Sequence, residues 1–134
     1  MEQTSLLPLP KKKKLALATK PTKILKIITE AIQSKKGENI ISLDLRKIKE
    51  ASTDFMLICE ANSSPQVRAI SENVKAEVLK KCGEAPRHFE GQQGLSWVLI
   101  DYVNVVVHIM LPETRKFYSI EEMWSDAAKE ELNG

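Results

Sequence analysis

The segment 96–110, with the sequence SWVLIDYVNVVVHIM, limits the possible folds of this chain more than any other segment. Its residues alternate as those of β-strands do, and the chain can turn back at Val103-Asn104. A two-residue connection pairs Tyr102 with Val105, and this pair sets the register on both sides of the turn. The segment therefore predicts two adjacent antiparallel strands.

This register divides the side chains of the two strands between two faces. One face is apolar throughout and should pack beneath helices; it carries Val98, Ile100, Tyr102, Val105, Val107 and Ile109. The other face mixes apolar and ionisable side chains, namely Trp97, Leu99, Asp101, Val106, His108 and Met110. Large aromatic residues and methionine beside few charges are typical of protein-binding surfaces, and a half-covered sheet face is the alternative.

The segments before this strand pair alternate between helical and strand patterns. Apolar residues at helical spacing predict a helix from Thr22 to a stop at Gly37. Strands are predicted at 39–45 and 54–61, and the second should be central because it is almost continuously apolar.

The clearest helix is predicted over 62–83. Ser63 or Ser64 can accept the first unpaired amides, Pro65 suits the first turn, and Gly83 can close the far end. A short third strand is predicted at 85–90, before the strand pair.

The sequence Ser119-Ile120-Glu121-Glu122 has the capping-box pattern, which predicts a last helix through Trp124 toward Leu132. The resulting order α-β-β-α-β-β-β-α predicts an α/β fold, with a mixed β-sheet and helices packed mainly on one face.

The first 20 residues combine two prolines with a lysine run and show no sustained period, so we expect a disordered leader at 1–20 and a single domain at 21–134. No apolar run approaches the ~20 residues of a membrane span, and the leader lacks the order of a signal peptide. Cys59 and Cys82 are the only cysteines, so buried, reduced thiols and a cytoplasmic location are expected.

The net charge of +2 conceals two regions of opposite sign. Residues 1–36 hold nine lysines and two glutamates, whereas residues 37–134 hold eleven lysines or arginines and sixteen aspartates or glutamates. Nucleic acids are bound chiefly through cationic surfaces, so the acidic body favours a basic protein partner. The exception is the run of Lys11, Lys12, Lys13 and Lys14, which is either a solvated leader or a weak contact to RNA.

Asp101 and His108 are the ionisable pair on the mixed face. In the predicted register they are diagonal neighbours roughly 7–8 Å apart, so His108 is expected to hold the carboxylate of Asp101 in place. Catalysis would also need a nucleophile, and no serine or cysteine shares this face, while His88 is the only other histidine. Histidine and acidic residues do not recur at metal-ligand spacing, so no catalytic residue, metal or cofactor is predicted.

The mixed face therefore predicts a protein-docking surface centred on Trp97 and Met110. Asp101 should add an ionic contact to a basic partner. The predicted docking residues are Trp97, Leu99, Asp101, His108, Met110 and Glu90.

Two stretches, DLRKIKEASTDFMLICEANSSPQV at 44–67 and WVLIDYVNVVVHIMLPETRKFYSIEEMWSDA at 97–127, resemble the ribosomal silencing factor family, also called Iojap-like. The resemblance extends over about residues 22–127 and leaves the lysine-rich leader outside. It depends on Ser52, Asp54, Ser63, Ser64, Val67, Trp97, Asp101, Val107, His108, Arg115, Tyr118, Glu121 and Trp124 in this order.

The resemblance implies a nucleotidyltransferase-like fold without transferase activity. It also implies binding to the large ribosomal subunit at its protein fourteen, obstruction of small-subunit joining, and a homodimer when the protein is free. Trp97 matches the family tryptophan associated with that contact, and Asp101 and His108 match neighbouring family positions.

Two other classes of function are the alternatives. A nucleotidyltransferase holds metal ions with closely spaced carboxylates, but this chain has Asp54 followed by Met56 where a second acid would be expected. An RNA-binding protein would act through the lysine-rich leader.

The turn departs from the family pattern. The usual Gly-Asp is here Val103-Asn104, and because valine tolerates positive φ poorly, a wider loop is the alternative to a type I′ turn.

Overall fold

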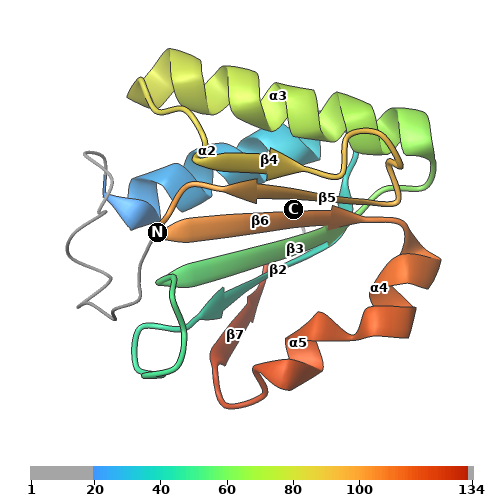
Figure 1. Ribbon diagram of the computed structural model, residues 1–134. Helices are drawn as coiled ribbons and strands as arrows, with labels where there is room; N and C mark the ends of the chain where they lie inside the picture. The colour runs from blue at the N-terminus through green and yellow to red at the C-terminus, as the bar shows by residue number, and fades with distance from the viewer. Residues whose placement is uncertain (1–19, 133–134) are drawn as a thin grey trace.

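The computed structural model describes residues 20–132, which form one mixed sheet with helices on both sides (Figure 1). The six strands follow the order β4-β5-β6-β3-β2-β7, and Figure 1 shows them from top to bottom with α2 behind and α4 and α5 at the lower right. The elements are α2 (Pro21–Ser34), β2 (Glu38–Asp44), β3 (Phe55–Glu60), α3 (Ser64–Cys82), β4 (His88–Glu90), β5 (Trp97–Asp101), β6 (Val105–Met110), α4 (Pro112–Tyr118), α5 (Ile120–Met123) and β7 (Ala128–Glu131).

The predicted α/β class and the mixed sheet are confirmed. β3 and β6 pair in parallel at the centre of the sheet, and every other neighbouring pair is antiparallel. The strand predicted to be central, β3, lies between β6 and β2. The two long helices, α2 and α3, cover one face of the sheet, as predicted.

The ends of α3 follow from its sequence. The Ser63 side chain accepts a hydrogen bond from the Gln66 amide at 3.3 Å, and Pro65 occupies the first turn. At the other end Gly83 adopts φ 69°, a left-handed conformation that glycine reaches without strain. The helix then buries the predicted stripe of Val67, Ile70, Val74 and Val78.

The helix-covered face holds the larger hydrophobic core. Ile24, Ile28 and Ile32 of α2 have no exposed area, and the predicted apolar face of β5 and β6 is equally buried. Burying each such side chain contributes about 1.5–3 kcal/mol. This layer therefore accounts for most of the apolar burial of the fold. Cys59 lies in it, as predicted, whereas Cys82 is only partly buried.

A smaller core lies on the opposite face. It brings together Leu43, Ile58, Met110 and Ile120, with Trp124 packed against them. This cluster covers β2, β3 and the end of β6. The second face above β4 and β5 is left less covered, with Leu99 and Trp97 partly exposed.

The turn between β5 and β6 has the predicted two-residue length, and the register is confirmed because Trp97 pairs with Met110 across it. The wider loop is not formed. Val103 instead adopts φ 76°, and the Asn104 amide donates to the Tyr102 carbonyl at 2.9 Å, which makes a γ-turn. A β-branched residue at positive φ is strained.

The helix predicted to open at Ser119 and run through Trp124 toward Leu132 begins where expected but is wrong in its length. Ser119 adopts φ 46° and its hydroxyl donates to the Lys116 carbonyl, so it does not cap a helix through its side chain. The helix α5 ends at Met123, and an unpredicted short helix, α4, precedes it. Residues 128–131 form the edge strand β7 because the edge of β2 offers unpaired backbone groups that a strand can satisfy.

Candidate protein-docking surface

The second face of β4 and β5 is the more open part of the sheet. Its central row runs from Glu90 across Leu99 to His108, which are cross-strand partners. Glu90 is exposed, Leu99 is partly exposed and His108 is 6% exposed. Exposure therefore falls from the sheet edge toward its centre.

Trp97 lies beside this row and is partly exposed. Its indole Nε1 donates to Nδ1 of His108 at 2.9 Å, and the two ring centroids are 5.8 Å apart. The bond satisfies the single polar group of the indole while the ring stays at the surface. Trp97 is thus held in one orientation.

His108 is the buried hydrogen-bond acceptor of the Trp97 indole. Because Nδ1 accepts a hydrogen bond, the neutral ring carries its proton on Nε2. Burial lowers the pKa of His108 to about 4, so the ring is neutral near pH 7. A neutral histidine beneath a tryptophan acts as a fixed acceptor and adds no charge to the surface.

The prediction that His108 holds Asp101 is wrong, although the two residues are the expected diagonal neighbours. Asp101 Oδ2 accepts from the Arg87 guanidinium at 2.9 Å, and Oδ1 accepts from the Val103 amide at 2.7 Å. The carboxylate therefore connects Arg87, the residue before β4, to the strained turn. Its charge is already opposed by Arg87, so it has a structural role in addition to any contact with a partner.

Met110 differs from the other predicted docking residues. It has no exposed area and packs in the smaller core with Ile58 and Ile120. The pattern that placed Met110 on the mixed face was correct, because Met110 pairs with Trp97. The C-terminal segment covers it, however, so Met110 cannot form the centre of an exposed surface.

Two aromatic residues of α4 complete the surface and were not among the predicted docking residues. Tyr118 is 52% exposed and its ring lies 4.8 Å from that of Trp97, while Phe117 is 80% exposed and lies edge-on to Tyr118 at 4.9 Å. We define the docking surface as Trp97, Leu99, Phe117 and Tyr118, with Glu90 at its margin. The sequence feature that could have identified this helix is Pro112, because proline suits the first turn of a helix. Phe117 and Tyr118 lie at the end of that helix.

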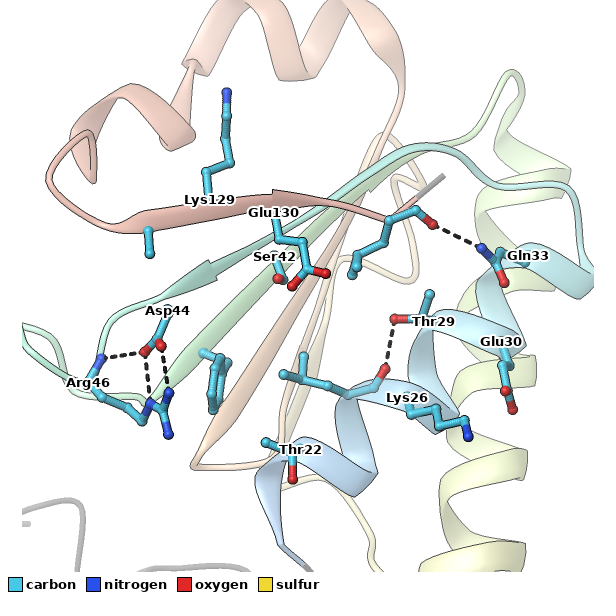
Figure 2. A pocket seen from close by; sticks show the side chains of 14 residues that line it. Thr22, Lys26, Thr29, Glu30, Gln33, Ser42, Asp44, Arg46, Lys129 and Glu130 are labelled. Atoms are coloured by element: carbon cyan, nitrogen blue, oxygen red, sulfur yellow. Dashed lines mark hydrogen bonds and ion pairs between the residues drawn. The ribbon is translucent and has the colours of Figure 1, made fainter. Parts of the chain in front are cut away.

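A separate hollow of about 630 Å³ lies between α2 and the edge formed by β2 and β7 (Figure 2). At one end the Arg46 guanidinium donates to both oxygens of Asp44, at 2.9 and 2.7 Å, and lowers the pKa of that carboxyl. At the other end Gln33 donates to the Leu132 carbonyl at 2.9 Å. Figure 2 shows both contacts at the walls of the hollow; the first is local to the end of β2, and the second joins α2 to the residue that follows β7.

The residues considered for nucleotidyl transfer do not form a metal site. Asp54 accepts a hydrogen bond from the Asn104 side chain at 2.9 Å, and Met56 is partly buried against the smaller core. Within residues 20–132, no three side chains of His, Cys, Asp or Glu are grouped as they would be around a metal ion. In the same range, no helix is long and apolar enough to cross a membrane.

Comparison with known proteins agrees with this fold. Residues 18–134 match the family model described as "Ribosomal silencing factor during starvation". The chain is 37% identical over 111 residues to the ribosomal silencing factor RsfS of Halalkalibacterium halodurans, covering 83% of this chain and 93% of that protein. A crystal structure of a Chromobacterium violaceum protein is similar with a TM-score of 0.75 and 36% identity, covering 80% of this chain and 88% of that one.

A more distant relative is a mouse protein named "Mitochondrial assembly of ribosomal large subunit protein 1". It is 33% identical over 75 residues, which are 54% of this chain and 33% of the mouse protein.

The described residues form a mixed α/β sheet with exposed aromatic rings at one of its faces. The match over residues 18–134 specifies the family: this chain belongs to the ribosomal silencing factors.

Proposed function

We propose that this protein represses translation by steric exclusion. Its docking surface binds the large ribosomal subunit at the subunit's protein fourteen, and the bound protein blocks joining of the small subunit. The observation that carries the proposal is the exposed aromatic cluster of Trp97, Tyr118 and Phe117 on an open sheet face. Aromatic anchors of this kind supply much of the binding energy of protein interfaces.

The charge of the body supports a basic ribosomal partner. Residues 37–134 hold sixteen acidic and eleven basic side chains, and exposed Glu90 lies at the margin of the surface. An acidic surface attracts a basic protein over long distances and accelerates its association. The mouse relative's name refers to assembly of the ribosomal large subunit, which agrees with a partner on that subunit.

Occlusion of a surface requires no chemistry, and we propose that the protein is not an enzyme. The one histidine of the docking region is engaged with Trp97, and the nearby carboxylate of Asp101 is engaged with Arg87. A general base must lie within hydrogen-bonding reach of the proton that it removes. Here the hydrogen bonds of His108 and Asp101 are made to other groups of the protein. The relatives' names denote regulators of ribosomes.

The test is stoichiometry. Purified protein added to dissociated subunits should reduce joined ribosomes in proportion to its occupancy of the large subunit, measured on sucrose gradients. The test variant is Trp97→Ala. Its matched control is Leu79→Ala, since Leu79 is 58% exposed on α3, away from the docking surface. Inhibition at far below one molecule per subunit, or co-migration that is unchanged in Trp97→Ala, would contradict the proposal.

We further propose that the free protein is a cytoplasmic homodimer. Exposed aromatic rings are costly in water, so a second copy of the same surface is a suitable partner when no ribosome is present. Equilibrium sedimentation of the wild type and of Trp97→Ala tests this, because a dimer that uses the docking surface should dissociate in the variant.

RNA contact through Lys11, Lys12, Lys13 and Lys14 is the second candidate, and these residues lie outside the described range. The charge contrast between residues 1–36 and the body favours it as an auxiliary contact. Deletion of residues 1–20 should then abolish binding to an RNA oligonucleotide and should leave subunit binding through Trp97 intact.

A further inference from the structure

The helix α4 presents two rings of the docking surface but buries almost nothing of its own. Of its seven residues, all within the described range, only Arg115 is buried, at 8% exposed. Phe117 and Tyr118 project outward from the same helix. Apolar burial is the usual anchor of an amphipathic helix. The position of these two rings must therefore depend on another interaction.

Arg115 provides that interaction through its whole guanidinium group. Nε donates to Glu121 Oε2 at 2.9 Å and Nη2 donates to Glu121 Oε1 at 3.2 Å, which is a bidentate pair. Nη1 donates to Glu60 Oε2 at 3.1 Å and to the Asn39 carbonyl at 2.7 Å. Bidentate, charge-assisted bonds restrict geometry as well as adding energy. Arg115 thus joins α4 to α5, to the end of β3 and to the start of β2.

The acceptors of Arg115 are themselves held in place. Asn39 adopts φ 51° where the pairing of β2 with β3 shifts register, and its side chain donates to Glu60 Oε1 at 3.0 Å. Glu60 therefore receives one bond from each side. The hydrogen bond from Arg115 lowers the pKa of Glu121, so this partner stays ionised near pH 7. The network is therefore bonded to the backbone of the sheet, at the Asn39 carbonyl, as well as to side chains.

The sheet end of the network lies two strands from Trp97 in the pairing register, at the same end of the sheet. Glu60 pairs with Met110, and Met110 pairs with Trp97 on the next strand. The outer end is α4, whose Tyr118 ring lies 4.8 Å from Trp97. One guanidinium therefore links β2 and β3 to the helix whose Tyr118 ring contacts Trp97.

We infer that Arg115 is a positioning residue of the docking surface: its bonds to Glu121, Glu60 and the Asn39 carbonyl hold α4 so that the Tyr118 ring lies against Trp97 and Phe117 lies beside Tyr118. The inference rests on the proposed function, because it assigns Arg115 a role in binding the large subunit. Arg115 itself is buried and need not touch the partner.

The experiment measures the position of the aromatic rings and the affinity for isolated large subunits separately. The chain has two tryptophans, so Trp124→Phe leaves Trp97 as the only one, and its near-ultraviolet circular dichroism reports the contact with Tyr118. In this background Arg115→Gln, Arg115→Lys and Glu121→Gln are compared for the Trp97 signal and for affinity to isolated large subunits. The control is Arg46→Gln, since Arg46 also makes a bidentate pair, with Asp44, at a distant strand end.

The expected result is that Arg115→Gln loses the Trp97 signal and binds at least about tenfold more weakly, a change of about one order in Kd. Arg115→Lys, which keeps the charge but not the planar fork, should fall between Arg115→Gln and the parent. The effects of Arg115→Gln and Glu121→Gln should not add in the double variant, because the two residues form one unit. Arg46→Gln should change neither the signal nor the affinity.

An Arg115→Gln variant that melts cooperatively and keeps both signal and affinity would overturn the inference. So would a variant that loses the signal and keeps full affinity, since the rings would then not need positioning. If Arg115→Gln fails to fold, Glu121→Gln decides by the same two readouts. If the parent protein does not bind large subunits, the proposed function fails, while the Trp97 signal still decides whether Arg115 positions α4.

Discussion

The two faces of the same strand pair differ in what covers them. Ile100 and Val107 point to the helix-covered face and have no exposed area, whereas their neighbours Leu99 and Trp97 point to the other face and are partly exposed. Alternation along β5 thus places core and surface residues one position apart. The difference shows that an apolar residue on a strand is core only where another element covers it.

The largest expected effect separates the two faces by stability. Ile100→Ala should reduce the free energy of unfolding by about 2–5 kcal/mol, because it leaves a cavity in the closely packed layer under α2 and α3. Leu99→Ala should cost less than about 1 kcal/mol, since this side chain is partly exposed. Urea unfolding of both variants measures the difference. Equal losses would mean that the second face is covered in solution.

The second expected effect is a pH dependence of the free energy of unfolding, and it arises from His108 on the mixed face of the strand pair. The folded-state pKa of His108 is lowered to about 4 from 6.5, so the unfolded chain binds a proton at a higher pH than the folded one. Stability from this residue is therefore intact above pH 6.5 and falls as the pH drops toward 4, by up to about 3 kcal/mol.

The measurement compares unfolding of the wild type and of His108→Gln at pH 7 and pH 4.5. The difference between the two proteins isolates His108 from the carboxylates that titrate in the same range. The wild type should lose more stability than the variant over this interval. Parallel curves would show that His108 titrates normally and is more exposed than its bond to Trp97 implies.

The third effect tests whether Trp97 is surface or core. Trp97→Ala should weaken binding to the large subunit by about 2 kcal/mol or more, roughly thirtyfold in Kd. His108→Gln should weaken it less, because it removes only the support of the indole. Leu79→Ala is the control for loss of an exposed apolar side chain. If Trp97→Ala loses affinity only because the domain has unfolded, Trp97 belongs to the core.

The fourth effect concerns the turn that joins the two faces. Val103→Gly should raise the free energy of unfolding by up to about 1 kcal/mol, because glycine adopts φ 76° without strain but loses more backbone entropy on folding. Thermal melting measures the change. Val103→Ala is the control, since alanine keeps the strain at positive φ and should give no gain.

The smallest effect tests the covered face. Among residues 20–132, the Tyr102 hydroxyl is the buried side-chain group without a hydrogen-bond partner. Tyr102→Phe removes it and keeps the shape of the ring, so stability should rise by about 0.5–1 kcal/mol. A loss of stability in a chemical-denaturation series would indicate that the hydroxyl has a partner in solution.

The fold predicted from the sequence was correct for α3, whose signals are local, whereas the equally local capping-box pattern at Ser119 predicted too long a helix. Ser63 and Gly83 mark the ends of α3, and the spacing of Val67, Ile70 and Val74 marks its buried side. The candidate site was predicted in part: Trp97 and Leu99 are on an open face, as expected. The partner of His108 was predicted wrongly, because a diagonal position allows contact with Asp101 without deciding between it and Trp97.

The sequence by itself determined the hairpin register, the long helices and the division of β5 and β6 into an apolar and a mixed face, because these depend on side-chain alternation and on residues adjacent in the chain. Tertiary structure decided the rest. Residues 128–131 became a strand because the edge of β2 had backbone groups to pair, and Met110 became core because Ile120 and its neighbours cover it. Tyr118 lies 4.8 Å from Trp97, and the bonds of Arg115 to Asn39 and Glu60 connect its helix to residues far away in the chain; such long-range contacts leave no periodic pattern in the sequence.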